Sequence, residues 1–152
     1  MKNISENLHH YRICSVYCFL MVYLLILFYY AVISRSSDGN FHIQTDIFWS
    51  YINPDDDIWK DNYLNVMIFV PLGFSICLLS KRFVFVKAFL GGLLISETIE
   101  CCQLIFKRGT FDVDDIINNA AGAIIGAIIW FIVIKLKFRI VGVKASADAK
   151  IE

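Results

Sequence analysis

Three polar side chains that could bind a ligand or transfer a proton recur along an otherwise apolar segment. Ser96, Glu100 and Gln103 stand at positions i, i+4 and i+7, a spacing that places them on one face of a helix. A carboxylate inside a membrane span costs on the order of 2.5–3.5 kcal/mol on insertion scales, so Glu100 should be protonated, paired or turned to water. Arg108 or Asn119 would be its partner. The pattern indicates a polar site.

A second polar row opens the next apolar segment. Asp115, Asn119 and Gly122 repeat at the same helical spacing, and we expect them to face the first row. Polar residues in the preceding segment and in the connecting loop complete the set. The candidate ligand site therefore comprises Asn65, Ser96, Glu100, Gln103, Arg108, Asp112, Asp115 and Asn119.

Purely structural roles compete with this interpretation. Asp112, Asp114 and Asp115 directly precede an apolar helix, where one of them could cap its N-terminus and all would favour the helix dipole. Glu100 and Gln103 could make interhelical hydrogen bonds that only hold the packing together.

Proline and glycine are expected to shape the helices. Pro71 and Gly73 lie within one apolar segment, where the proline would favour a kink. Gly122 and Gly126 form a Gly-x-x-x-Gly pair, which lets two helices approach closely and does not require a dimer.

Four apolar segments, each about as long as a bilayer span, must position these side chains. Hydrophobic residues make up 58% of the 152-residue chain and the mean hydropathy is +0.62, whereas soluble domains are roughly 45–50% apolar. About 20 helical residues cross the hydrocarbon layer. We therefore expect an all-α, polytopic membrane bundle over residues 13–134, with transmembrane helices at about 13–33, 62–80, 83–106 and 116–134.

The remaining segments connect or flank these spans. We expect a cytoplasmic N-terminal segment over 1–12, outer loops over 34–61 and 107–115, and a basic cytoplasmic tail over 135–152. Within the first outer loop, residues 41–52 could form a short interfacial helix anchored by its aromatic side chains.

Charge sets the expected orientation. Ten of the 14 Lys and Arg residues fall on the side that holds both termini: Lys2, Arg12, Lys81, Arg82, Lys87, Lys135, Lys137, Arg139, Lys144 and Lys150. The opposite side holds Arg35, Lys60, Lys107 and Arg108. By the positive-inside rule both termini are cytoplasmic and the polar cluster faces outward.

Composition and motifs also exclude some functions. The net charge is zero, which removes the usual electrostatic case for nucleic-acid binding. Cys14 and Cys18 are one helical turn apart but no His or carboxylate joins them, so we expect no metal and no other cofactor. The chain contains no Gly-rich phosphate loop, HExxH or GxSxG motif, so no recognised catalytic motif is present.

Three motifs together resemble a known family. The segment NVMIFVPLGF, from Asn65, resembles the N-x-x-x-F-x-P-L-G-F signature of VanZ-like membrane proteins. ECCQ, from Glu100, resembles the E-x-x-Q of that family, and RGTFDVDDIINNAAGAIIG, from Arg108, resembles its R-G-x-F-D-x-D-D-x-x-x-N-x-x-G-x-x-x-G. The resemblance covers roughly residues 62–130.

The family takes its name from a bacterial protein associated with low-level teicoplanin resistance. The resemblance implies a multi-pass protein of the bacterial cytoplasmic membrane that alters antibiotic access or lipid-linked wall material, and it supplies no reaction. Our first hypothesis is a non-enzymatic module that binds membrane lipid head groups, a cell-wall precursor or a glycopeptide, with Arg108 as an anion clamp.

Two alternatives remain open at this stage. One is a membrane-embedded acid–base enzyme acting on a lipid-linked substrate, with Glu100 as base and Asp112 or Asp115 as its partner. The other is a small transporter, which would have to be oligomeric because four spans are few for a pore. The sequence does not decide the oligomeric state.

Overall fold

Four long helices dominate the computed structural model, which describes residues 2–37, 42–52, 55–80 and 82–148. They are α1 (Lys2–Phe28), which continues into the π-helical η1 (Tyr29–Ile33), α3 (Asp56–Leu79), α4 (Val84–Phe106) and α5 (Val113–Asp148). All four are long and apolar enough to cross a membrane. The expected all-α class with four membrane-spanning helices is confirmed.

Three helices extend well beyond the expected spans, and α1 already begins at Lys2 rather than at residue 13. α3 begins at Asp56 because the Asp55 side chain caps it, accepting a hydrogen bond from the Ile58 N–H at 2.8 Å. α5 continues to Asp148, so much of the tail after residue 134 is helical. No proline interrupts that stretch, and helix formation extends at little cost once a turn exists.

Helices α3 and α5 pack against each other through glycine. A methyl group added at Gly122 or Gly126 would lie 2.1 Å from the Val66 or Val70 carbonyl oxygen of α3. One added at Gly73 would lie 1.9 Å from a carbonyl oxygen of α5. The Gly-x-x-x-Gly pair is therefore used inside the bundle, and α3 runs on through Pro71 to Leu79.

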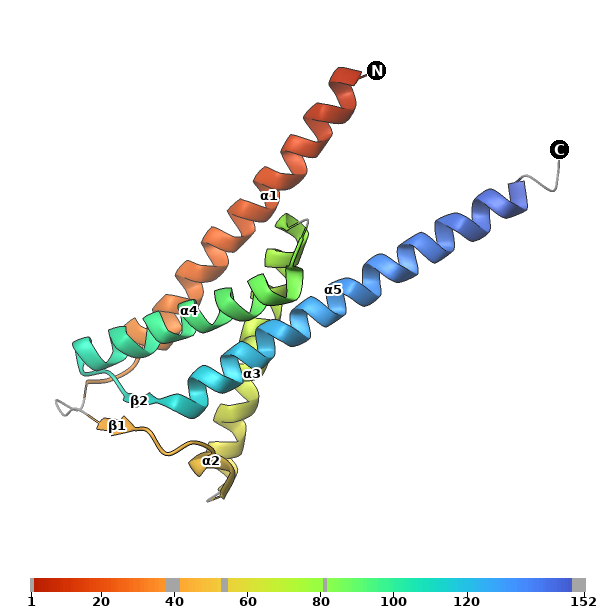
Figure 1. The fold of residues 1–152 in the computed structure, drawn as a ribbon. Helices are drawn as coiled ribbons and strands as arrows, with labels where there is room; N and C mark the ends of the chain where they lie inside the picture. The colour runs from red at the N-terminus through yellow and green to blue at the C-terminus, as the bar shows by residue number, and fades with distance from the viewer. Residues whose placement is uncertain (1, 38–41, 53–54, 81, 149–152) are drawn as a thin grey trace.

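Helix α1 lies at the edge of the bundle (Figure 1). Its end contributes Leu27 to the main apolar core, and Val32 of η1 joins it there. Phe69 and Leu72 of α3 and Ile99 of α4 complete that core. About one turn before Leu27 in α1, the Tyr23 hydroxyl donates a hydrogen bond to the Ile68 carbonyl oxygen of α3.

The first outer loop differs from its expected form. Residues His42–Gln44 form β1, which pairs in parallel with β2 (Thr110–Asp112). Only Trp49–Ile52, as α2, is helical, so the expected interfacial helix over 41–52 is wrong over 42–48; residue 41 lies outside the described residues. Phe48 has a positive φ of 65°, which a continuous right-handed helix cannot contain.

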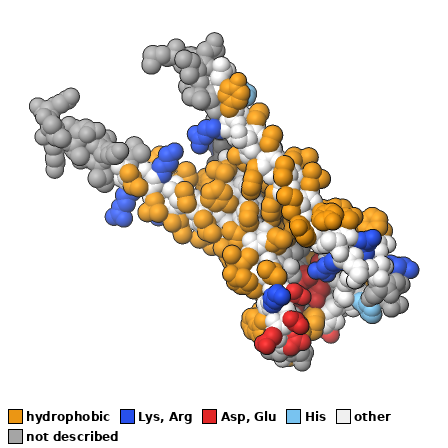
Figure 2. Space-filling model, turned by 180° about the vertical axis from the view of Figure 1, so that it is seen from behind, with side chains coloured by type: hydrophobic (Ala, Val, Ile, Leu, Met, Phe, Trp, Pro, Cys, Tyr) orange, Lys and Arg blue, Asp and Glu red, His pale blue; other side chains and the backbone are white. Residues whose placement is uncertain are grey.

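The surface separates apolar from charged regions. Apolar side chains cover the long helices, while acidic side chains gather near the end that carries α2 and the two strands (Figure 2). Both termini project from the other end (Figure 1). Lys81 and Lys150, two of the residues used to predict orientation, lie outside the described residues.

Candidate functional site

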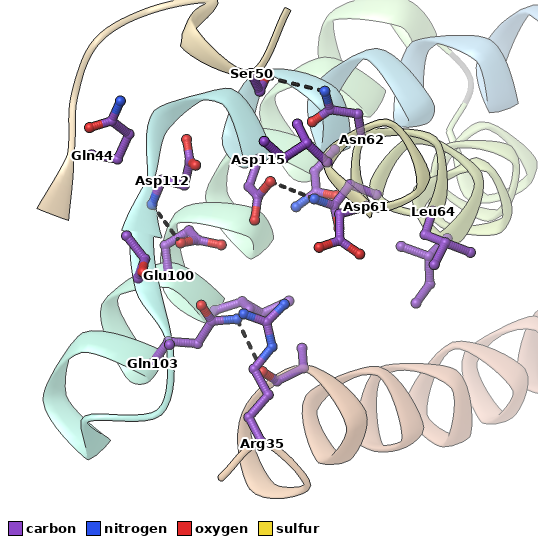
Figure 3. A pocket seen from close by; sticks show the side chains of 18 of the residues that line it. Arg35, Gln44, Ser50, Asp61, Asn62, Leu64, Glu100, Gln103, Asp112 and Asp115 are labelled. Carbon is purple, nitrogen blue, oxygen red and sulfur yellow. Dashed lines mark hydrogen bonds between the residues drawn. The ribbon is translucent and has the colours of Figure 1, made fainter. Parts of the chain in front are cut away.

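A cavity of about 810 Å³ lies at the end of the bundle opposite the termini. Residues from every helix and strand line it, and their polar groups converge on its centre (Figure 3). The structure brings six of the eight predicted site residues to this cavity: Asn65, Glu100, Gln103, Asp112, Asp115 and Asn119.

The polar row on α4 faces inward. Ser96, Glu100 and Gln103 are all buried, although the helix around them is apolar. Gln103 Nε2 donates to the Ala31 carbonyl oxygen of η1 at 3.0 Å, and Glu100 Oε2 accepts from the Asp112 backbone N–H at 3.0 Å. The row thus connects α4 to η1 and to β2.

The second row, on α5, bonds to both neighbouring helices. Asp115 Oδ1 accepts from Asn65 Nδ2 of α3 at 2.6 Å. Asn119 Nδ2 donates to Ser96 Oγ of α4 at 2.7 Å. Ser96 itself does not line the cavity. Asn119 is therefore bonded to Ser96, whereas Glu100, for which it was an expected partner, uses the backbone of β2.

Asp112 and Asp114 have mainly structural roles. Asp112 Oδ1 accepts from the Asp114 N–H at 2.8 Å, which caps the start of α5, and its Oδ2 accepts from Trp49 Nε1 at 3.0 Å. Burial raises the pKa of the Asp112 carboxyl, while these N–H donors oppose the shift. Asp114 is buried and accepts from the N–H groups of Phe48 and Ser50 at 2.7 and 3.0 Å, so it anchors α2.

A polar network that the sequence analysis missed supports this anchor. Asn62 Nδ2 donates to Ser50 Oγ at 3.2 Å, and Asn118 Nδ2 donates to Asn62 Oδ1 at 2.9 Å. The Tyr51 hydroxyl donates to Asn118 Oδ1. The i, i+4 spacing of Asp114 and Asn118 was a visible signal for a second polar face on α5.

The guanidinium that lines the cavity belongs to Arg35 and not to Arg108, the anion clamp expected from the sequence. Arg108 is not among the residues that line the cavity. Its guanidinium donates to the carbonyl oxygens of Ile33 and Arg35, and so holds the end of η1. Arg35 follows η1 directly, which brings its side chain into the cavity from below in Figure 3.

In the part of the chain that the structure describes, no group of three His, Cys, Asp or Glu side chains is placed to hold a metal ion. The carboxylates instead accept hydrogen bonds from protein N–H groups, as described above.

Fold and site together define a multi-pass membrane protein with a polar cavity at one end of its bundle. The chain belongs to the VanZ/LLP1 family, whose pattern matches residues 14–134. It is 37% identical over 62 residues to Protein VanZ of Enterococcus faecium. That match covers 41% of this chain and 38% of the relative. No solved structure matches the chain.

Proposed function

We propose that this protein binds the head group of an amphiphile in the cavity and thereby influences teicoplanin-type antibiotic susceptibility. The amphiphile would be a membrane lipid, a lipid-linked cell-wall precursor or a glycopeptide. The observation that carries the proposal is a cavity with polar side chains at its centre and exposed apolar side chains at its edge.

The apolar edge lies between α1–η1 and α3. Tyr30, Leu64 and Ile68 line the cavity yet are 64%, 50% and 39% exposed, so the cavity reaches the lipid-facing surface there. In Figure 3, Leu64 lies beside α3 and above the α1 ribbon, to the right of the labelled polar side chains. A molecule with a polar head and an acyl chain matches this arrangement, because each part would meet side chains of its own polarity.

Orientation supports a ligand from outside the cell. The cavity lies at the end opposite both termini, and the excess of Lys and Arg near the termini favours a cytoplasmic location for them. In the bacterial cytoplasmic membrane the cavity would then face the outer leaflet, where wall precursors and glycopeptides are accessible. The likeness to Protein VanZ supports the link to teicoplanin.

Leu64→Trp tests the proposal at the cavity edge. The larger side chain should narrow the apolar opening, so less amphiphile should co-purify with the protein. The bound amphiphile would be measured by native mass spectrometry, and teicoplanin susceptibility would be measured in cells that contain equal amounts of protein.

Met67→Trp is the matched control, because Met67 is an exposed apolar residue on the same helix and does not line the cavity. It should retain both the bound amphiphile and the effect on susceptibility. Equal amounts of bound amphiphile in the two variants would contradict the proposal.

A further inference from the structure

Two buried acceptors beside the cavity have no donor among the described residues. They are Gln103 Oε1 and Asn119 Oδ1, in side chains that are 2% and 4% exposed and that line the cavity. The orientation of the Gln103 amide is set, because its Nε2 donates to a backbone carbonyl, which can only accept. A buried acceptor without a partner is unfavourable, so a ligand that donates hydrogen bonds would satisfy it.

The charged side chains that line the cavity also favour a ligand that donates hydrogen bonds. The lining carboxylates are Asp61, Glu100, Asp112 and Asp115. Against them stand the Arg35 guanidinium and the His42 imidazole. Glu100 and Asp115 interact electrostatically with each other and with Arg35. The carboxylates outnumber the cationic groups, which favours a positively charged ligand group.

These carboxylates have capacity for further donors. Glu100 accepts one hydrogen bond, from Asp112, and Asp115 accepts one from Asn65, while an ionised carboxylate offers about four acceptor positions. A primary ammonium is a compact charge with three N–H donors. Sugar hydroxyls could also donate, but they carry no charge that could form an ion pair with a carboxylate.

We infer that the bound head group carries a primary ammonium, held by the carboxylates of Glu100 and Asp115 and by Gln103 Oε1. An anionic group of the same head, such as a phosphate, contacts Arg35, whose guanidinium makes no hydrogen bond to the part of the chain described here. The ligand class is thus a zwitterionic amphiphile of the aminophospholipid type. This inference rests on the proposed function and specifies its ligand.

Lipids with identical chains test the ammonium. Dioleoyl phosphatidylethanolamine, phosphatidylglycerol and phosphatidylcholine would be added in equal amounts to the purified full-length protein, and occupancy would be measured by native mass spectrometry. The ethanolamine lipid should bind about tenfold more tightly than the glycerol lipid, which lacks the ammonium. The choline lipid should bind less tightly than the ethanolamine lipid, because its methyl groups replace the N–H donors.

Variants of the two carboxylates test whether they cause the preference for the ethanolamine lipid. Glu100→Gln and Asp115→Asn should each reduce the ratio of ethanolamine to glycerol lipid, and Glu97→Gln, at an exposed position of the same helix, should not. The Asp115 variant and the wild-type lipid series decide the question even if Glu100→Gln does not fold. An unchanged ratio in a folded Asp115→Asn protein would overturn the assignment to these residues.

Oleylamine has a primary ammonium and an acyl-like chain but no phosphate, so it tests the ammonium contact separately from the phosphate contact. It should displace phosphatidylethanolamine from the wild-type protein, and it should do so at a lower concentration from Arg35→Gln, because that variant loses the contact to the phosphate and keeps the carboxylates. Failure to displace would overturn the ammonium site, as would glycerol lipid binding as tightly as ethanolamine lipid, while the proposed function would stand. If no amphiphile bound to the wild-type protein, both proposals would fail.

Discussion

At the scale of single residues, Arg35 occupies the position in the cavity that the sequence suggested for Arg108. Arg108 lies in the motif that resembles the family pattern, yet its guanidinium bonds to the backbone of residues 33 and 35. Arg35 lies outside that motif but lines the cavity. The Arg108 charge therefore has a structural use, while the Arg35 charge lies in the cavity, where we propose that it contacts the ligand.

Replacing each arginine by glutamine should distinguish these uses. Arg108→Gln removes charged hydrogen bonds to backbone carbonyls, each worth about 1.5–3 kcal/mol when well shielded and less at this partly exposed position. It should lower the thermal unfolding midpoint by a few degrees, whereas Arg35→Gln should lower the midpoint less and should alter ligand binding. The midpoint would be measured in detergent without added lipid. A larger loss of stability in Arg35→Gln would contradict this division of roles.

At the scale of elements, the contact between α3 and α5 positions the site. The Asn65 and Asp115 side chains can meet at 2.6 Å because Gly122 and Gly126, about two and three turns farther along α5, let the two helices approach closely. At Gly122 the neighbouring atom is a backbone oxygen of Val66, which cannot move without bending α3.

Alanine at two helical glycines tests this contact. Gly122→Ala should destabilise the protein by about 1–3 kcal/mol, because its methyl group would overlap the Val66 carbonyl oxygen. At Gly91 the nearest atom is the movable end of the Ile76 side chain, 2.6 Å away, so Gly91→Ala should be nearly neutral or should gain up to about 1 kcal/mol of helix propensity. Unfolding in a denaturing detergent would measure both. Equal losses at the two positions would show that the close approach is not limiting.

At the scale of the whole molecule, the two ends of the bundle differ in charge. Acidic side chains gather near the cavity (Figure 2), and Lys and Arg are concentrated near the termini. The structure places the two termini at one end (Figure 1), and the positive-inside rule predicts which end is cytoplasmic.

Cysteine labelling in intact cells tests that orientation. A membrane-impermeant thiol reagent should label Ser37→Cys and Asp56→Cys, because both positions are exposed at the cavity end. It should miss Arg82→Cys and Lys137→Cys until the cells are opened. The unmodified protein, with its five cysteines, supplies the background signal. Labelling of Arg82→Cys in intact cells would reverse the orientation.

The sequence by itself determined the features that depend on local periodicity. Uninterrupted apolar segments predicted four spanning helices, and the i, i+4, i+7 spacing of Ser96, Glu100 and Gln103 predicted that one face of α4 would be polar and buried. Both follow because 3.6 residues per turn convert spacing along the chain into a direction in space. The Gly-x-x-x-Gly pair likewise predicted a close helix contact, although not the partner helix.

Only the tertiary structure decided which distant segments meet at the cavity. The parallel pairing of β1 with β2 joins residues 68 positions apart, and the hydrogen bonds from Phe48 and Ser50 to Asp114 span 66 and 64 positions. One from Arg108 reaches 75 positions back along the chain. No periodic spacing encodes such contacts. They arise because buried backbone and carboxylate groups must find partners wherever the packed helices bring the loops together. The Arg108 guanidinium accordingly donates to backbone carbonyl oxygens, whereas the Arg35 side chain lines the cavity.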